Sequence, residues 1–259
     1  MRTERSSSTG TSTPSALDPD APRPPSRTDP APLGVPLFLL NLKSYPVVFG
    51  PRAERLAEQL EQISIELDVP SAIAPAPCDL GRLSEAVELP ILAQHVDPLD
   101  AGAHTGYVLP EAVRGAGGKG SLVNHSEHRL PQAEIGEVVR RLAALGMVSV
   151  VCAQDARNAA SLARFHPPYL AVEPPELIGS GRSVSRVQPE VIRDTVLAVR
   201  KVSPGTRVLC GAGIQDRGDV EKAIELGSEG ILIASAVALA PDPGAKLRDL
   251  LSGFSSSET

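Results

Sequence analysis

Three side chains with complementary chemistry each stand directly after a short apolar run of the sequence. They are Lys43, His125 and Glu173. A carboxylate can take a proton from carbon, an imidazole can polarise or protonate an oxygen, and an ammonium group can hold a developing negative charge. A set of this kind suits the removal of a proton next to a carbonyl group.

Small residues follow three of the later apolar runs. Gly181, Gly213, Ala234 and Ser235 leave room for backbone N–H groups to approach a ligand closely. The net charge of −6 opposes the approach of an anion, so an anionic ligand would need such local donors. These residues together predict a small phosphorylated carbonyl compound as the ligand.

The chemistry needs a scaffold that brings distant residues together, and the pattern of apolar runs predicts one. Most of the runs are rich in Val, Ile or Leu on both faces, which is typical of parallel strands covered on both sides. The eight strands expected are 37–42, 71–74, 91–95, 121–124, 148–152, 169–172, 207–210 and 230–234.

Amphipathic stretches with helical spacing lie between the runs, at 52–67, 135–145 and 189–202 among others. Pro131 and Pro189 are placed to begin helices, and Gly146 and Gly227 are placed to end them. Strand and helix therefore alternate, which predicts an α/β fold with a parallel sheet. Even spacing, and polar residues after several different strands, favour a closed (β/α)8 barrel over an open doubly wound sheet.

The first 32 residues differ from the rest of the chain of 259. Ser, Thr and Pro make up 18 of these 32 residues, and Leu17 is the one large aliphatic residue. Such a segment buries too little apolar surface to fold, so we expect a disordered tail at 1–32 and one catalytic barrel domain at 33–254.

Composition excludes several classes of protein. The acidic net charge and the lack of a basic run argue against a nucleic-acid partner. No apolar run approaches the roughly 20 residues of a membrane span, and the tail lacks the apolar core of a signal peptide. The three cysteines lie far apart with no CxxC pair, which favours a reducing, cytoplasmic setting.

The motifs at the predicted strand ends resemble those of the triosephosphate isomerase family in its short archaeal form. Their order and spacing agree over residues 36–252. The motifs are Asn41-Leu42-Lys43, Gln94-His95-Val96-Asp97, Gly102-Ala103-His104-Thr105-Gly106, Asn124-His125-Ser126-Glu127-His128-Arg129 and Ala171-Val172-Glu173-Pro174.

This resemblance implies a TIM barrel and an isomerase of glycolysis and gluconeogenesis. Such an enzyme interconverts D-glyceraldehyde 3-phosphate and dihydroxyacetone phosphate through an enediolate, with no cofactor and no metal. It further implies Glu173 as general base, His125 as neutral electrophile and Lys43 as the residue that stabilises the enediolate, with Glu127 in support. The substrate-binding residues that it implies are Asn41, Lys43, Ile178, Gly179, Gly213, Ala234 and Ser235, with residues 174–181 as a closing lid.

Other interpretations remain open at this stage. Arg182 and Ser183 depart from the family pattern just past the expected lid, so a four-carbon sugar phosphate is an alternative substrate. A non-catalytic phosphosugar-binding protein, with the tail as its interaction element, is a second alternative. The family usually associates, so we expect a homo-oligomer, either a dimer or a tetramer. His125 and His128 lack the spacing and the further ligands of a metal site, and His95 is expected to be a hydrogen-bonded residue of the pocket floor or core.

Overall fold

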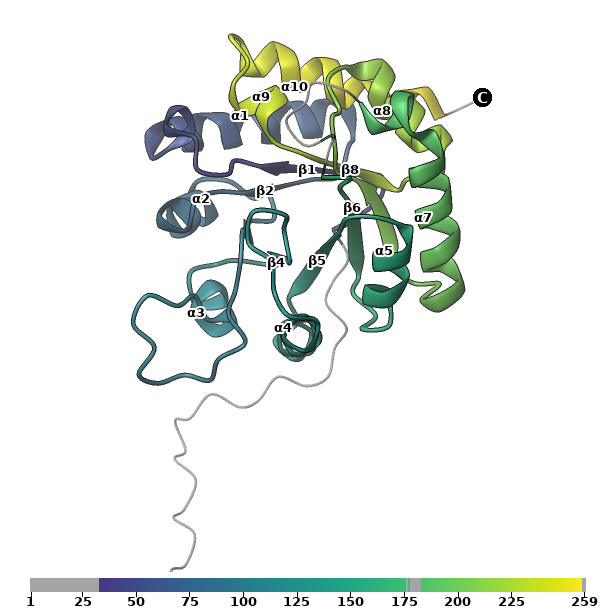
Figure 1. The fold of residues 1–259 in the computed structure, drawn as a ribbon. Helices are drawn as coiled ribbons and strands as arrows, with labels where there is room; N and C mark the ends of the chain where they lie inside the picture. Colours follow the sequence, from purple (N-terminus) through teal and green to yellow (C-terminus); the bar gives the residue numbers. More distant parts are fainter. Residues whose placement is uncertain (1–32, 176, 178–182, 258–259) are drawn as a thin grey trace, which may run out of the picture.

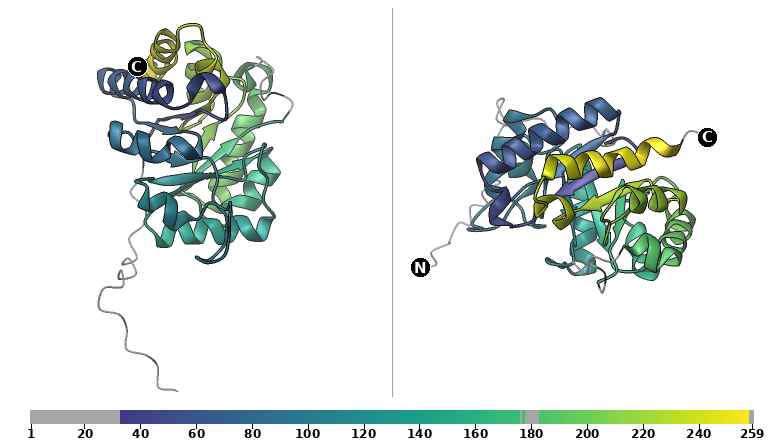
Figure 2. Two further views of the ribbon diagram at one scale, coloured as in Figure 1. Left: turned by 90° about the vertical axis from the view of Figure 1, so that its left-hand side faces the viewer. Right: turned by 90° about the horizontal axis from the view of Figure 1, so that it is seen from above.

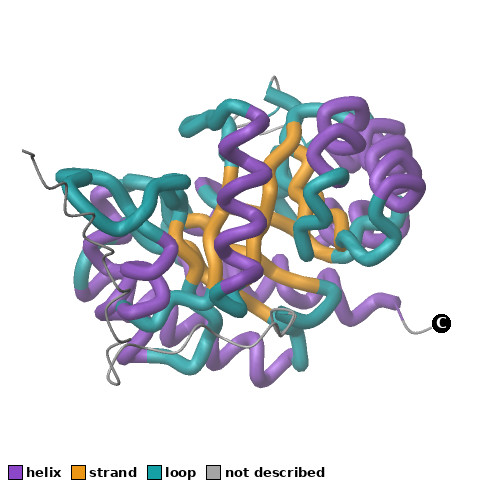
Figure 3. Tube along the Cα trace, turned by 90° about the horizontal axis from the view of Figure 1, so that it is seen from below, coloured by secondary structure: helices purple, strands orange, loops and turns teal. Residues whose placement is uncertain are grey.

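A computed structural model describes residues 33–175, 177 and 183–257. The predicted disordered tail at 1–32 lies outside the described residues. Within the described residues, eight strands alternate with helices, and the strands occupy the middle of the molecule with helices around them (Figures 1 and 3). The strands are β1 (Leu37–Asn41), β2 (Ser71–Ala74), β3 (Leu92–Ala93), β4 (Gly120–Val123), β5 (Val148–Ala153), β6 (Tyr169–Val172), β7 (Arg207–Cys210) and β8 (Gly230–Ile233).

All strand pairs are parallel, and the strands form one closed circuit. The order in the sheet is β2-β1-β8-β7-β6-β5-β4-β3, and a parallel bridge between Ile73 and Ile91 joins its two ends. This arrangement confirms the predicted (β/α)8 barrel, in which the carboxyl ends of all strands open onto one mouth.

The helices lie on the outside of the barrel. Figure 2 shows that α1 and α10, from the two ends of the domain, lie side by side, and a paired contact between Glu66 and Arg248 joins them. The helices are α1 (Pro51–Leu67), α2 (Leu80–Ala86), α3 (Pro110–Gly115), α4 (Gln132–Ala144), α5 (Ala156–Ala163), α6 (Val184–Val187), α7 (Pro189–Val202), α8 (Arg217–Glu225), α9 (Ser235–Ala238) and α10 (Pro243–Leu251), with short 3-10 turns at Pro46–Val48, Pro77–Asp79 and Ser252–Ser257.

Two apolar layers explain why the strands read as continuous apolar runs. Leu37 and Leu39 belong to the cluster inside the barrel, whereas Phe38 and Leu40 belong to the cluster between the strands and the helices. Successive side chains of a strand point to opposite faces, and here both faces are buried.

The strands and helices differ from prediction mainly at their ends. The third strand is shorter than the expected 91–95, and just past its end the side chain of Gln94 donates hydrogen bonds to the carbonyls of Lys43 and of Ala74 at the end of β2. Pro131 is the N-cap of α4 and not a residue of its first turn, whereas Pro189 opens α7 as expected. Gly146 and Gly227 follow helices with φ values of 67° and 95°, conformations that glycine adopts without strain.

Among the described residues, no helix has the length and apolar character needed to cross a bilayer.

Candidate active site

The loop after β1 holds Lys43 in a tightly fixed conformation. The backbone of Lys43 has a φ of 51°, in the left-handed region that side chains other than glycine rarely occupy. Its N–H donates to Oδ1 of Asn41 at 2.9 Å, and its carbonyl accepts from Nε2 of Gln94 at 2.9 Å. Both main-chain groups of this residue are therefore bonded to side chains, which stabilises the strained backbone and aims the ammonium group.

The ammonium group of Lys43 lies against Glu127. Its Nζ is 2.8 Å from Oε1 of Glu127, and its side chain is 13% exposed. Glu127 is itself 58% exposed, so water screens this pair and it contributes modestly to stability. Its effect is geometric, because it links the β1 loop to the β4 loop.

The β4 loop orients the ring of His125. The backbone N–H of Glu127 donates to Nδ1 of His125 at 3.2 Å. A backbone N–H can only donate, so Nδ1 acts as an acceptor and the ring proton sits on Nε2. Nε2 faces the site and lies 3.4 Å from Oε1 of Glu173.

Asn124 fixes this loop from behind. Its side chain donates to the carbonyl of Cys152 at 2.9 Å and accepts from the N–H of Leu130 at 3.1 Å. Its own backbone has a φ of 60°, which Asn tolerates better than most residues. The family motif therefore includes a residue that shapes the loop as well as residues that face the pocket.

Glu173 is the most buried ionisable side chain of the site. The residue is 3% exposed, its N–H donates to the carbonyl of Ala153 at 2.7 Å, and its Oε2 has no hydrogen-bond partner among the described residues. A buried carboxylate oxygen without a partner is costly, and such an oxygen is free to accept a proton from a ligand. Burial, together with the charge of Glu173, raises the pKa of the adjacent Cys152 thiol well above its usual value, so that thiol stays protonated.

A small cavity of about 60 Å³ joins these three side chains. Asn41, Lys43, Tyr45, His125 and Glu173 form one part of its lining, and residues after β7, at the end of β8 and at the start of α9 form the other. Gly213 adopts a φ of 72° there, as expected for a turn in which the backbone faces the ligand. The residues on this second side are Gly211, Gly213, Ile214, Gln215, Leu232, Ile233, Ala234, Ser235 and Ala236.

The structure thus brings together most of the predicted site residues. Lys43, His125, Glu173, Asn41, Gly213, Ala234 and Ser235 all line the small cavity, and Glu127 contacts Lys43 from outside it. Ile178 and Gly179, with most of the expected lid and the unusual Arg182, lie outside the described residues.

A larger open hollow of about 740 Å³ adjoins the cavity on the side of β3. His95 and His128 stack there with ring centroids 3.7 Å apart, and Nε2 of His95 lies 3.1 Å from Oδ1 of Asp97. Burial and the neighbouring His95 lower the pKa of His128. His95 is therefore hydrogen-bonded at the pocket rim, and no group of three metal-ligating side chains occurs in the part of the chain that the structure describes.

Sequence reasoning missed several residues that shape the site. Gln94 holds the Lys43 loop, and Ile214 and Gln215 form part of the cavity wall. Gln94 was expected inside the third strand and belonged to a quoted motif, but its contact with the Lys43 loop was not predicted. No sequence feature marked Gln215, because it contacts helices α8 and α10 through its main chain and not through its side chain.

The comparisons with known proteins agree with this geometry. The family model for triosephosphate isomerase matches residues 36–250. The chain is 50% identical over 216 residues to the triosephosphate isomerase of Methanothermus fervidus, covering 83% of this chain and 97% of the relative. It is 49% identical over 217 residues to that of Methanothermobacter thermautotrophicus (84% and 95% covered) and 47% identical over 217 residues to that of Methanoculleus marisnigri (84% and 98% covered).

Proposed function

The chain belongs to the triosephosphate isomerase family, and we propose that Glu173, His125 and Lys43 carry out its reaction in the small cavity. The protein is an isomerase that interconverts D-glyceraldehyde 3-phosphate and dihydroxyacetone phosphate, a reaction of glycolysis. The observation that carries the assignment of residues is their convergence from the ends of β1, β4 and β6 on one cavity, where Oε2 of Glu173 has no partner in the described part of the chain.

Glu173 is the general base of the proposed mechanism. Its carboxylate takes a proton from C1 of dihydroxyacetone phosphate, and the electron pair of that C–H bond moves into an enediolate. The same carboxyl group then returns a proton to C2, which gives D-glyceraldehyde 3-phosphate. The burial of the carboxyl group, and the lack of a hydrogen-bond partner for Oε2 among the described residues, support this role.

His125 moves a proton between the two substrate oxygens. The N–H donated by Glu127 to Nδ1 leaves the ring proton on Nε2, on the side that faces the cavity. Nε2–H can therefore donate to the carbonyl oxygen as negative charge develops on it, and can recover a proton from the neighbouring hydroxyl.

Lys43 stabilises the negative charge of the enediolate. Its Nζ is fixed by Glu127 and its backbone by Asn41 and Gln94, so the ammonium group is in place before the charge forms. We assign the phosphate group to the part of the cavity lined by Gly213, Ala234 and Ser235, whose small side chains leave room for backbone N–H groups to approach it.

We also propose a cytoplasmic homo-oligomer, either a dimer or a tetramer. Tyr107, at the rim of the large hollow, is 57% exposed, and tyrosine is enriched at protein–protein interfaces. All three cysteines are free thiols, in keeping with a reducing compartment. Sedimentation of the purified protein tests the association, and a single species of 27.1 kDa contradicts it.

An isomerase assay of the purified chain tests the proposed function. We expect turnover of three-carbon sugar phosphates by the wild-type protein, and a loss of about 10² to 10⁴ in kcat for His125→Asn. His166→Asn is the matched control, because His166 bonds Ser203 near the amino end of β6, at the opposite end of the barrel. Equal kcat in wild type and His125→Asn contradicts the role of His125, and a higher kcat/KM for a four-carbon substrate favours the alternative substrate.

A further inference from the structure

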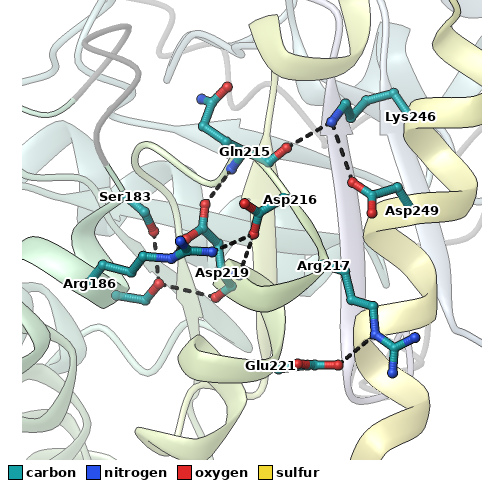
Figure 4. Close-up of polar contacts among 10 residues, drawn as sticks. Ser183, Arg186, Gln215, Asp216, Arg217, Asp219, Glu221, Lys246 and Asp249 are labelled. Carbon is teal, nitrogen blue, oxygen red and sulfur yellow. Dashed lines mark hydrogen bonds and ion pairs between the residues drawn. The ribbon is translucent and has the colours of Figure 1, made fainter.

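The cavity wall at Gly213–Gln215 is held from behind by charged side chains of two helices. Figure 4 shows the main chain of Gln215 between Asp219 of α8 and Lys246 of α10. The N–H of Gln215 donates to Oδ2 of Asp219 at 2.8 Å, and its carbonyl accepts from Nζ of Lys246 at 3.0 Å. Both bonds involve a charged partner, and such bonds are shorter and stronger than neutral ones.

Asp219 is itself fixed by a further set of contacts. The residue is 2% exposed, and its Oδ1 pairs with Nε of Arg186 on α6. The same arginine reaches Oδ1 of Asp216 through Nη2 at 2.7 Å, and Asp216 also caps α8 by accepting the N–H of Asp219 at 2.9 Å. The carboxylate that holds Gln215 is therefore buried, paired and unable to rotate freely.

The segment just before Arg186 is also hydrogen-bonded to Asp219. The hydroxyl of Ser185 donates to the carbonyl of Asp219 at 3.1 Å, and the hydroxyls of Ser183 and Ser185 lie 2.7 Å apart. The segment at α6 therefore meets the loop after β7 and the following helix α8 at Asp219, and Lys246 of α10 contacts the same loop at Gln215.

We propose that Asp219 and Lys246 are positioning residues for substrate binding. They hold the peptide groups on both sides of Gln215, and so fix the main chain from Gly213 to Gln215 on the cavity edge to which we assign the substrate phosphate. This inference rests on the proposed function. It predicts that loss of either side chain weakens phosphate binding and leaves proton transfer at Glu173 intact.

Lys246→Met is the principal test, because Lys246 is partly exposed and the variant keeps the apolar part of the side chain. Lys222→Met is the matched control. Lys246 pairs with Asp249, three residues later on α10, and Lys222 pairs in the same way with Glu225 on α8. Asp219→Asn is the second test, because it removes the charge and keeps the volume.

The measurement is the Kd of inorganic phosphate by calorimetry, together with KM, kcat and Tm. We expect Kd and KM to rise about three- to tenfold in Lys246→Met and Asp219→Asn, with kcat and the values for Lys222→Met within twofold of wild type. A Kd within twofold of wild type in Lys246→Met overturns the proposal, as does wild-type protein without measurable phosphate binding.

These outcomes separate this proposal from the proposed function. A lower Tm with an unchanged Kd assigns the cluster to stability alone and overturns the positioning role. Calorimetry does not depend on turnover, so a failed isomerase assay would refute the proposed function while the Kd comparison still decides the role of Lys246. If Asp219→Asn does not fold, Lys246→Met decides alone.

Discussion

The two walls of the small cavity present different parts of the polypeptide to the ligand. On the side of β1, β4 and β6, the groups that face the cavity are the side chains of Lys43, His125 and Glu173. The lining residues from β8 and from the segments after β7 and β8 carry no ionisable side chain, and several of them are small, as at Gly211, Gly213 and Ala234. We refer to them below as the side-chain wall and the main-chain wall.

The two walls are also held in different ways. Neighbouring residues within the site brace the side-chain wall, such as Glu127 against both Lys43 and His125. Charged residues on helices outside the cavity brace the main-chain wall, through the contacts of Asp219 and Lys246 with Gln215. We therefore expect substitutions in the side-chain wall to lower kcat, and substitutions behind the main-chain wall to raise KM.

The largest effect is expected from Glu173→Gln. An amide of the same volume keeps the packing but cannot take a proton, so kcat should fall by about 10² to 10⁴. Glu229→Gln is the matched control, because Glu229 pairs with Arg207 just before β8, at the opposite end of the barrel. Steady-state kinetics measure both variants, and a kcat of Glu173→Gln within tenfold of wild type would remove this residue from the base role.

An intermediate effect is expected from Gly211→Ala, which tests the contact between the walls. A Cβ at position 211 would lie 2.6 Å from Cγ of Glu173 and 3.2 Å from the carbonyl of Val172, so the catalytic side chain must move. Misplacement by about 1 Å can cost about 100-fold in rate, and we expect a fall in kcat of that order with a smaller change in KM.

Gly205→Ala is the control for this variant, because a Cβ there meets nothing within 4 Å. A kcat of Gly211→Ala equal to that of the wild type would show that Glu173 tolerates the added Cβ. It would contradict the expectation that the main-chain wall positions Glu173 for proton transfer.

The smallest effect is expected for thiol reactivity at Cys152 and Cys210, the two buried cysteines. Burial raises the pKa of Cys210, which precedes the main-chain wall, to about 12, and burial also raises the pKa of Cys152 beside Glu173. The thiolate is the reactive form, so at pH 8 we expect one fast-reacting thiol, the exposed Cys78.

Titration with an aromatic disulfide reagent measures this, and Cys78→Ser should leave no thiol reactive until denaturant is added. Raising the pH from 7 to 9 should still leave Cys152 and Cys210 unreacted in the native protein. A second thiol that reacts at the rate of Cys78 in the native protein would show that one of the two walls opens to solvent.

The side-chain wall was largely predictable from sequence. Residue type alone indicates the chemistry that is possible at Lys43, His125 and Glu173. Because each of them follows an apolar run, the sequence also predicts that they lie at the mouth of a barrel. The apolar runs could be assigned to strands because both faces of each strand are buried, so the pattern is continuous.

The main-chain wall and its supports were less predictable. A glycine in the sequence shows that a Cβ is absent, but only the structure shows that a Cβ on Gly211 would meet Glu173. Asp219 and Lys246 have the residue types of ordinary helix surfaces, and their common contact with Gln215 depends on how α8 and α10 pack. Tertiary contacts of this kind leave no local pattern in a single sequence.

Isomerisation of dihydroxyacetone phosphate in D2O tests the central claim, that one buried carboxylate moves a proton between neighbouring carbons. The account predicts D-glyceraldehyde 3-phosphate with solvent deuterium at C2, formed by the wild-type protein and strongly reduced in Glu173→Gln, as read by proton NMR of the product. Deuterium incorporation by Glu173→Gln at the wild-type rate would contradict it.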